Sequence, residues 1–134
     1  MLAEFGKLEP TVDSGAAITA FPKKTFQAYL SIEDSNIKGR TASGEWVDSE
    51  GTAKVGVCTE DGSYHEMKGE VMDVKKSLVS VSAMVDLGRD VIFSSRGSHV
   101  LLSSGKRIPL KRVDGVFTLP LIDAMRFRWQ DHRL

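Results

Sequence analysis

Short apolar runs separated by turn residues follow one another along most of the chain. Two runs, at 8–12 and 17–21, flank the turn Asp13-Ser14-Gly15, and a further pair around Glu60-Asp61-Gly62-Ser63 fills 52–74. Runs of this length, rich in β-branched residues and bounded by turn chemistry, predict strands and hairpins. The chain is therefore expected to be mainly β.

The remaining pattern adds strands, a hairpin arm and little helix. The polar, glycine-punctuated segment 32–56 favours a hairpin that reaches away from the core. A helix is expected at 82–87, where apolar residues fall at helical spacing and Gly88 supplies a stop, and another of one or two turns at 23–30. Further strands are predicted at 78–81, 91–93, 98–102, 107–110 and 116–121.

Length and composition indicate one domain. With 134 residues, 41% apolar and 27% charged, the chain can bury a single hydrophobic core. Residues 1–6 are expected to be linker residues, 7–121 the folded domain, and 122–134 a tail that could be frayed, a short amphipathic helix or a remnant of a longer chain.

Charge and the absence of certain segments exclude several classes of function. Eighteen basic residues balance eighteen acidic ones, which disfavours nucleic acid and anionic membranes as primary partners. Neither a spanning helix nor a secretory signal is apparent in the sequence. The single cysteine, Cys58, allows no internal disulfide, so we expect an intracellular, cytoplasmic protein or one inside cytoplasmic particles.

No cofactor or metal is expected. The three histidines, His65, His99 and His132, are far apart in sequence, and with Cys58 they make a poor candidate metal site. No glycine-rich phosphate-binding loop follows a predicted strand.

The feature best suited to chemistry is the turn Asp13-Ser14-Gly15-Ala16 between apolar strands. Gly15 permits a sharp turn, Ser14 offers a hydroxyl to neighbouring backbone, and the strands hold Asp13 where a substrate can reach it. Hydrolysis of a peptide by activated water benefits from two carboxyl groups that share one proton. Because the chain has one such turn, the second carboxylate would have to come from an identical partner across a two-fold axis.

Three blocks, in order, resemble the retropepsin-like aspartic proteases, and among them the protease region of copia-type retrotransposon polyproteins. They are Val12-Asp13-Ser14-Gly15-Ala16, then Thr41-Ala42-Ser43-Gly44 with the later Gly51 and Val55, then the segment 78–88 followed by Val91-Ile92-Phe93. The resemblance runs from about Thr11 to Leu121.

The resemblance implies a closed β-barrel-type acid protease fold with one short C-terminal helix followed by extra hairpins. Asp13 would be the catalytic aspartate, and Ser14, Gly15 and Ala16 would support its turn. The flap over the substrate would be formed by Thr41, Ala42, Ser43 and Gly44, and the floor of the pocket by Leu78, Val79 and Ser80.

The resemblance also implies a homodimeric endopeptidase that cleaves extended segments of a polyprotein. The chain departs from viral members at Ser80, where they have glycine, and at Ala17 and Ile18, where they have an acidic residue. Two alternatives therefore stay open: a domesticated, non-catalytic dimeric module of the same fold that binds peptides, and a plain scaffold domain.

Overall fold

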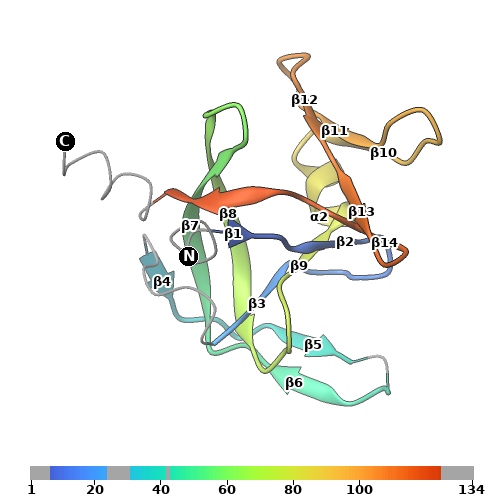
Figure 1. Ribbon diagram of the computed structural model, residues 1–134. Helices are drawn as coiled ribbons and strands as arrows, with labels where there is room; N and C mark the ends of the chain where they lie inside the picture. Colours follow the sequence, from blue (N-terminus) through green and yellow to red (C-terminus); the bar gives the residue numbers. More distant parts are fainter. Residues whose placement is uncertain (1–6, 24–30, 42, 125–134) are drawn as a thin grey trace.

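The computed structural model describes residues 7–23, 31–41 and 43–124, and its architecture is mainly β, as predicted (Figure 1). The strands are β1 Lys7–Leu8, β2 Thr11–Asp13, β3 Ala20–Pro22, β4 Ser31–Glu33, β5 Lys38–Arg40, β6 Trp46–Asp48, β7 Gly51–Thr59, β8 Tyr64–Met72, β9 Leu78–Ser80, β10 Asp90–Ile92, β11 His99–Leu101, β12 Arg107–Pro109, β13 Lys111–Val113, β14 Val116–Thr118 and β15 Leu121–Asp123. The helix is α2, Val81–Asp86.

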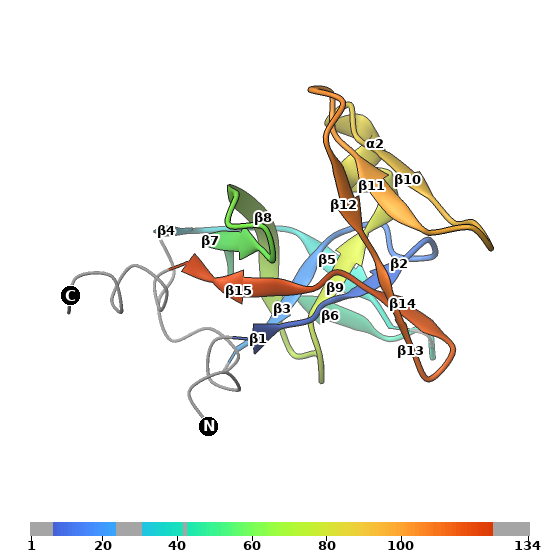
Figure 2. The ribbon, with the colours of Figure 1, turned by 45° about the horizontal axis from the view of Figure 1, so that its top comes forward.

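Ten strands form one large sheet in the order β1-β15-β7-β8-β3-β9-β2-β14-β13, with β4 also pairing with β7. This pairing runs as an open path, so among the described residues the sheet does not close into the expected barrel. The three-stranded sheet β10-β11-β12 stands to one side of it, and β5 and β6 form a separate hairpin (Figure 2).

The core lies where the large sheet, the three-stranded sheet and α2 meet. Phe21, Val57 and Val79 come from the large sheet, Val100 from β11 and Met84 from α2, and all are buried in one cluster. Inward-facing residues alternate with outward-facing ones along β7 and β8 only in part, because β7 is buried on both faces at 55–59 and β8 at 69–72. The three-stranded sheet is thus fastened to the large one by apolar packing.

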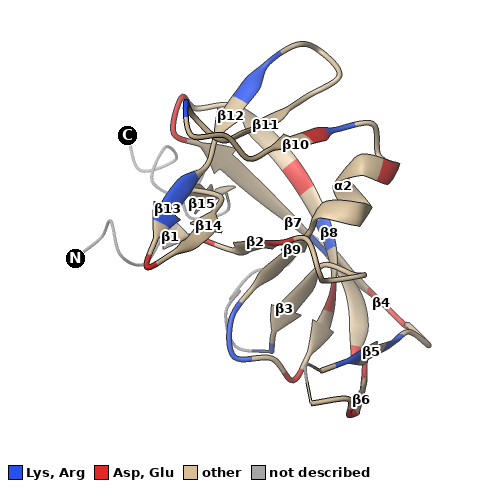
Figure 3. Cartoon of the chain, turned by 90° about the vertical axis from the view of Figure 1, so that its right-hand side faces the viewer, with Lys and Arg blue, Asp and Glu red and all other residues tan. Residues whose placement is uncertain are grey.

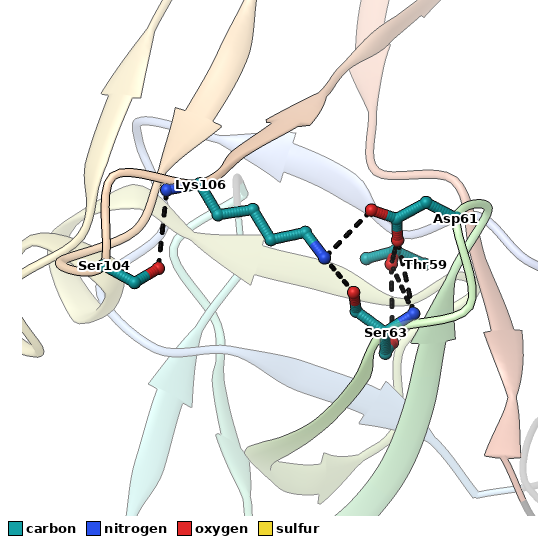
Figure 4. A network of polar contacts seen from close by, with 5 residues as sticks. All are labelled: Thr59, Asp61, Ser63, Ser104 and Lys106. Atoms are coloured by element: carbon teal, nitrogen blue, oxygen red, sulfur yellow. Dashed lines mark hydrogen bonds and ion pairs between the residues drawn. The ribbon is translucent and has the colours of Figure 1, made fainter.

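The turn between β7 and β8 is also fastened from outside. Lys106, just before β12, forms an ion pair of 2.9 Å with Asp61 and donates a hydrogen bond to Ser63 (Figure 4). Thr59 donates a short hydrogen bond to the same carboxylate. These bonds hold the pKa of Asp61 well below its usual range; the bond from Thr59 has the largest effect and that from Lys106 the next largest.

The sequence predicted most elements but not all of their neighbours. The runs at 8–12 and 17–21 overlap β2 and β3, each of which ends one residue later, but these strands do not pair with each other, because β9 lies between them. β13 was not predicted, and β15 continues to Asp123, two residues beyond the expected end of the domain. Residues 24–30 of the helix expected at 23–30, and residues 125–134 of the tail, lie outside the described residues.

Candidate functional site

The turn that carries Asp13 is built on parallel pairing between distant parts of the chain. β2 pairs with β9 so that Thr11 lies opposite Leu78 and Asp13 opposite Ser80. On its other side β2 meets β14, where Thr11 lies opposite Thr118. Asp13 therefore stands at the end of a strand with neighbours on both sides.

Local hydrogen bonds fix the shape of the turn. The Gly15 amide donates to Asp13 Oδ1 over 2.8 Å, and the Ala16 amide donates to the Asp13 carbonyl over 3.4 Å. A methyl group on Gly15 would lie 3.3 Å from the same Oδ1. The carboxylate is thus held by its own turn, as expected for an aspartate two residues before a turn amide.

Ser80 supports the turn from below. Its side chain is 0% exposed and donates to the Ala16 carbonyl over 2.7 Å. The same oxygen accepts a hydrogen bond from the Ala83 amide and so caps α2, while the Ser80 amide donates to Thr19 Oγ1 over 3.0 Å. One buried hydroxyl therefore joins the Asp13 turn, β9 and the helix.

Asp13 and Ser14 line a cavity of about 480 Å³ between β2, β9 and the β13–β14 turn. The other lining residues are Thr11, Val12, Lys76, Leu78, Phe93, Gly115, Val116 and Phe117. Asp13 is the one acidic residue among the described residues that line it. Asp13 is half-buried, and Ser14 and Gly15 are exposed, so solvent reaches the turn.

The predicted floor residues take different places. Leu78 lines the cavity with Asp13, whereas Val79 points into the hydrophobic core. Ser80 lies beneath the turn through its bond to Ala16. Leu78 is thus the floor candidate that a molecule in this cavity could touch.

The predicted flap residues lie at the tip of the β5–β6 hairpin. Gly44 has a φ of 90° and donates its amide to the Thr41 carbonyl, and the hydroxyls of Thr41 and Ser43 are 2.9 Å apart. Of the described residues of the tip, none lines the Asp13 cavity. Ala42 lies outside the described residues.

Sequence reasoning missed the aromatic wall of the cavity. The rings of Phe93 and Phe117 have centroids 5.0 Å apart, and the Arg112 guanidinium lies 5.5 Å from the centre of the Phe117 ring. Phe93 and Phe117 belong to predicted strands, but which strands become neighbours of β2 is not visible in a local pattern. The Asp114-Gly115 turn was the available signal, since it places Val116 and Phe117 at the start of a strand.

Titratable groups elsewhere do not form a metal centre in the part of the chain that is described. Among the described residues, no three His, Cys, Asp or Glu side chains lie close enough together to hold a metal ion. His132 lies outside the described residues. His65 Nε2 is buried with no hydrogen-bond partner. Burial, and next the charges of Lys106 and Arg89, lower the pKa of His65.

Acidic and basic residues both occur near β10–β12 and near β5–β6 in Figure 3. This agrees with the equal numbers of acidic and basic residues in the sequence. No described helix is long and apolar enough to cross a membrane. No protein-family model, curated protein or solved structure matches the chain.

Proposed function

We propose that the chain is a retropepsin-like aspartic endopeptidase that acts as a homodimer on extended segments of a polyprotein such as that of a retrotransposon. The observation that carries the proposal is the placement of Asp13: a half-exposed carboxylate on a turn held by Ser80, at the edge of a cavity with no other acidic group among its described lining residues.

The proposed chemistry uses one Asp13 from each subunit. The ionised carboxylate takes a proton from a water molecule, whose oxygen attacks the peptide carbonyl carbon, while the protonated partner carboxyl donates its proton to the carbonyl oxygen. Collapse of the resulting diol breaks the C–N bond, and a proton passes to the leaving amine. The dyad titrates as a pair, so the pH profile of the rate reports the pair and not either residue.

The β5–β6 hairpin is proposed as the flap, because its tip is exposed and the loop between Asp13 and β3 lies close to its first strand. A methyl group on Gly39 would lie 3.4 Å from Ile18 Cδ1. The substrate would lie as an extended strand between hairpin and turn. The aromatic pair Phe93 and Phe117, with Leu78, would supply apolar contact beside the scissile bond.

The test is cleavage of a peptide library by wild type and by Asp13→Asn across acidic to neutral pH. We expect the variant to lose at least about 10³-fold in kcat/KM, since it removes both members of the acid–base pair. Asp114→Asn is the matched control, because Asp114 has a φ of 50°, which asparagine tolerates, and does not line the cavity.

A covalently linked tandem of two copies tests the shared pair. With Asp13→Asn in one copy, we expect nearly complete loss of activity, whereas independent sites would retain about half. Equal cleavage by wild type and Asp13→Asn would contradict the assignment of Asp13. Peptide binding without turnover by the wild-type dimer would favour the non-catalytic binding module.

A further inference from the structure

A buried carboxylate lies at the base of the β5–β6 hairpin. Glu70, on β8, is 5% exposed and accepts hydrogen bonds from three hydroxyl groups. Among the described residues it makes no ion pair with a basic side chain. Because burying a carboxylate without compensation is costly, these three hydroxyls are what allow it to remain there.

The three hydroxyls come from both legs of the hairpin and from the strand that follows. Ser35, before β5, donates to Oε1 over 2.6 Å, and Ser49, after β6, donates to the same oxygen over 2.9 Å. Thr52, on β7, donates to Oε2 over 2.8 Å. The two ends of the hairpin thus meet at one carboxylate, and the Ser49 amide also donates to the Ile37 carbonyl between them.

Glu70 is joined to the Asp13 turn as well. Its amide donates to the Thr19 carbonyl over 2.8 Å, and Thr19 Oγ1 accepts the Ser80 amide. Ser80 in turn donates to the Ala16 carbonyl within the turn. A continuous series of hydrogen bonds therefore runs from the base of the hairpin to the turn that carries Asp13.

Two other contacts among the described residues fix the base of the hairpin: the Glu50 amide donates to the Val71 carbonyl over 2.8 Å, and the Glu50 carboxylate forms an exposed ion pair of 2.8 Å with Lys23. The side chains of β5 and β6 are mostly exposed, and a two-stranded hairpin is marginally stable by itself. A methyl group on Gly39 would lie 2.7 Å from Met72 Cε, so β5 passes close to the end of β8 at this point. Figure 1 shows β5 and β6 extending away from the rest of the chain.

We propose that Glu70 is the positioning residue of the β5–β6 hairpin: its buried carboxylate holds both legs and thereby sets where the hairpin stands relative to the Asp13 turn. The effect on cleavage rests on the proposed function, but the effect on the hairpin does not.

The experiment is amide hydrogen exchange on Glu70→Gln, with exchange in 38–48 compared with that in 53–58. The glutamine side chain has the same shape but offers a donor where a carboxylate oxygen accepted. We expect exchange in 38–48 to accelerate at least about tenfold, with 53–58 changing less. Glu66→Gln is the matched control, because Glu66 lies on the same strand but is exposed, and its ion pair is with Lys54 of β7 and not with the hairpin. It should leave exchange in 38–48 unchanged.

Two further variants keep the test decisive if Glu70→Gln does not fold. Ser35→Ala and Ser49→Ala each remove one leg's bond and leave the carboxylate with two donors, so each should accelerate exchange in 38–48 by several-fold. Where Glu70→Gln does fold, adding either alanine to it should accelerate exchange much less than that alanine does alone. Unchanged exchange in all of these variants would overturn the role of Glu70.

Cleavage assays separate this proposal from the proposed function. If the chain is a protease, Glu70→Gln should raise KM more than it lowers kcat, because a displaced hairpin weakens substrate binding while Asp13 is intact. A fall in kcat with KM unchanged would contradict that role. If the wild type cleaves nothing, the proposed function fails, and the exchange result still decides the role of Glu70.

Discussion

The β7–β8 and β5–β6 hairpins are fastened at opposite ends. The body of β7–β8 lies in the core, and its tip is tied to β12 through Asp61 and Lys106. The hydrogen bonds of the described residues at the β5–β6 tip join residues of that hairpin to one another, and its anchor is the Glu70 carboxylate at its base. The β7–β8 hairpin is thus held along its length and at its tip, whereas the described contacts of β5–β6 with other segments lie at its base.

The largest difference is expected from placing a methyl group on the inner face of each hairpin. In β8, Gly69→Ala would bring Cβ to 2.6 Å from a ring carbon of Phe21, which is 0% exposed and has no room to move. We expect it to lower the free energy of unfolding by about 2 kcal/mol.

The matched change in the other hairpin is Gly39→Ala. There Cβ would meet the terminal carbon of Met72, at 2.7 Å, and a methionine end can rotate away. A loss below about 1 kcal/mol is expected. Urea unfolding measures both, and equal losses would show that the base of β5–β6 is as tightly packed as the core.

A smaller difference is expected at the two tips. Gly62 and Gly44 have φ values of 89° and 90°, and a Cβ on either would meet nothing within 4 Å. Alanine at each position therefore costs about 1 kcal/mol of backbone strain and nothing else.

The two tips should release that strain differently. In Gly62→Ala we expect the whole of this strain to lower the free energy of unfolding, because the ion pair with Lys106 prevents the tip from opening locally. In Gly44→Ala the tip can open locally, so the cost should appear mainly as faster amide exchange at 43–46. The same loss of global stability in both variants would argue that the β5–β6 tip is not free to open.

The smallest effect is expected from the charge at the β7–β8 tip. Because the pKa of Asp61 is lower in the folded chain than its ordinary value of 3.8, its contribution to stability is present above that value and is lost as the pH falls below it. Asp61→Asn lacks this contribution. The difference in urea midpoint between wild type and variant should therefore shrink from pH 7 toward about pH 3.

The exposed pair Lys38 and Asp48, 3.8 Å apart on β5–β6, supplies the comparison. Asp48→Asn should change the midpoint less at neutral pH, because an exposed pair with no further side-chain hydrogen bond among the described residues contributes little. A larger effect from Asp48 than from Asp61 would contradict the difference between the two hairpins.

Local signals in the sequence were sufficient for the elements themselves. Apolar runs bounded by turn residues identified the strands around Asp13, and helical spacing with Gly88 identified α2. Both features depend on residues close together in the chain. The short strand β13 was missed because Lys111 and Arg112 are polar and exposed, so it has no apolar run.

Long-range placement could not be predicted in the same way. Nothing near Asp13 in sequence indicates that β9, more than sixty residues later, lies between β2 and β3, or that Phe93 and Phe117 would share its cavity. Glu70 has the appearance of an outward-facing polar residue in an alternating strand, and its burial depends on hydroxyls from three other segments. The proposed pair of aspartates likewise depends on how two chains associate, which the sequence pattern of one chain does not describe.

The pairing of β2 with β14, and of β1 with β15, has a consequence for biosynthesis. Within this domain β2 is synthesised well before β14, so the edge of β2 that pairs with β14 stays unpaired until residues 116–118 have followed. Long-range pairing of this kind is slow, because the whole intervening segment must be ordered first. The strand that leads into the Asp13 turn therefore gains its last neighbour only after residues 116–118 have been translated.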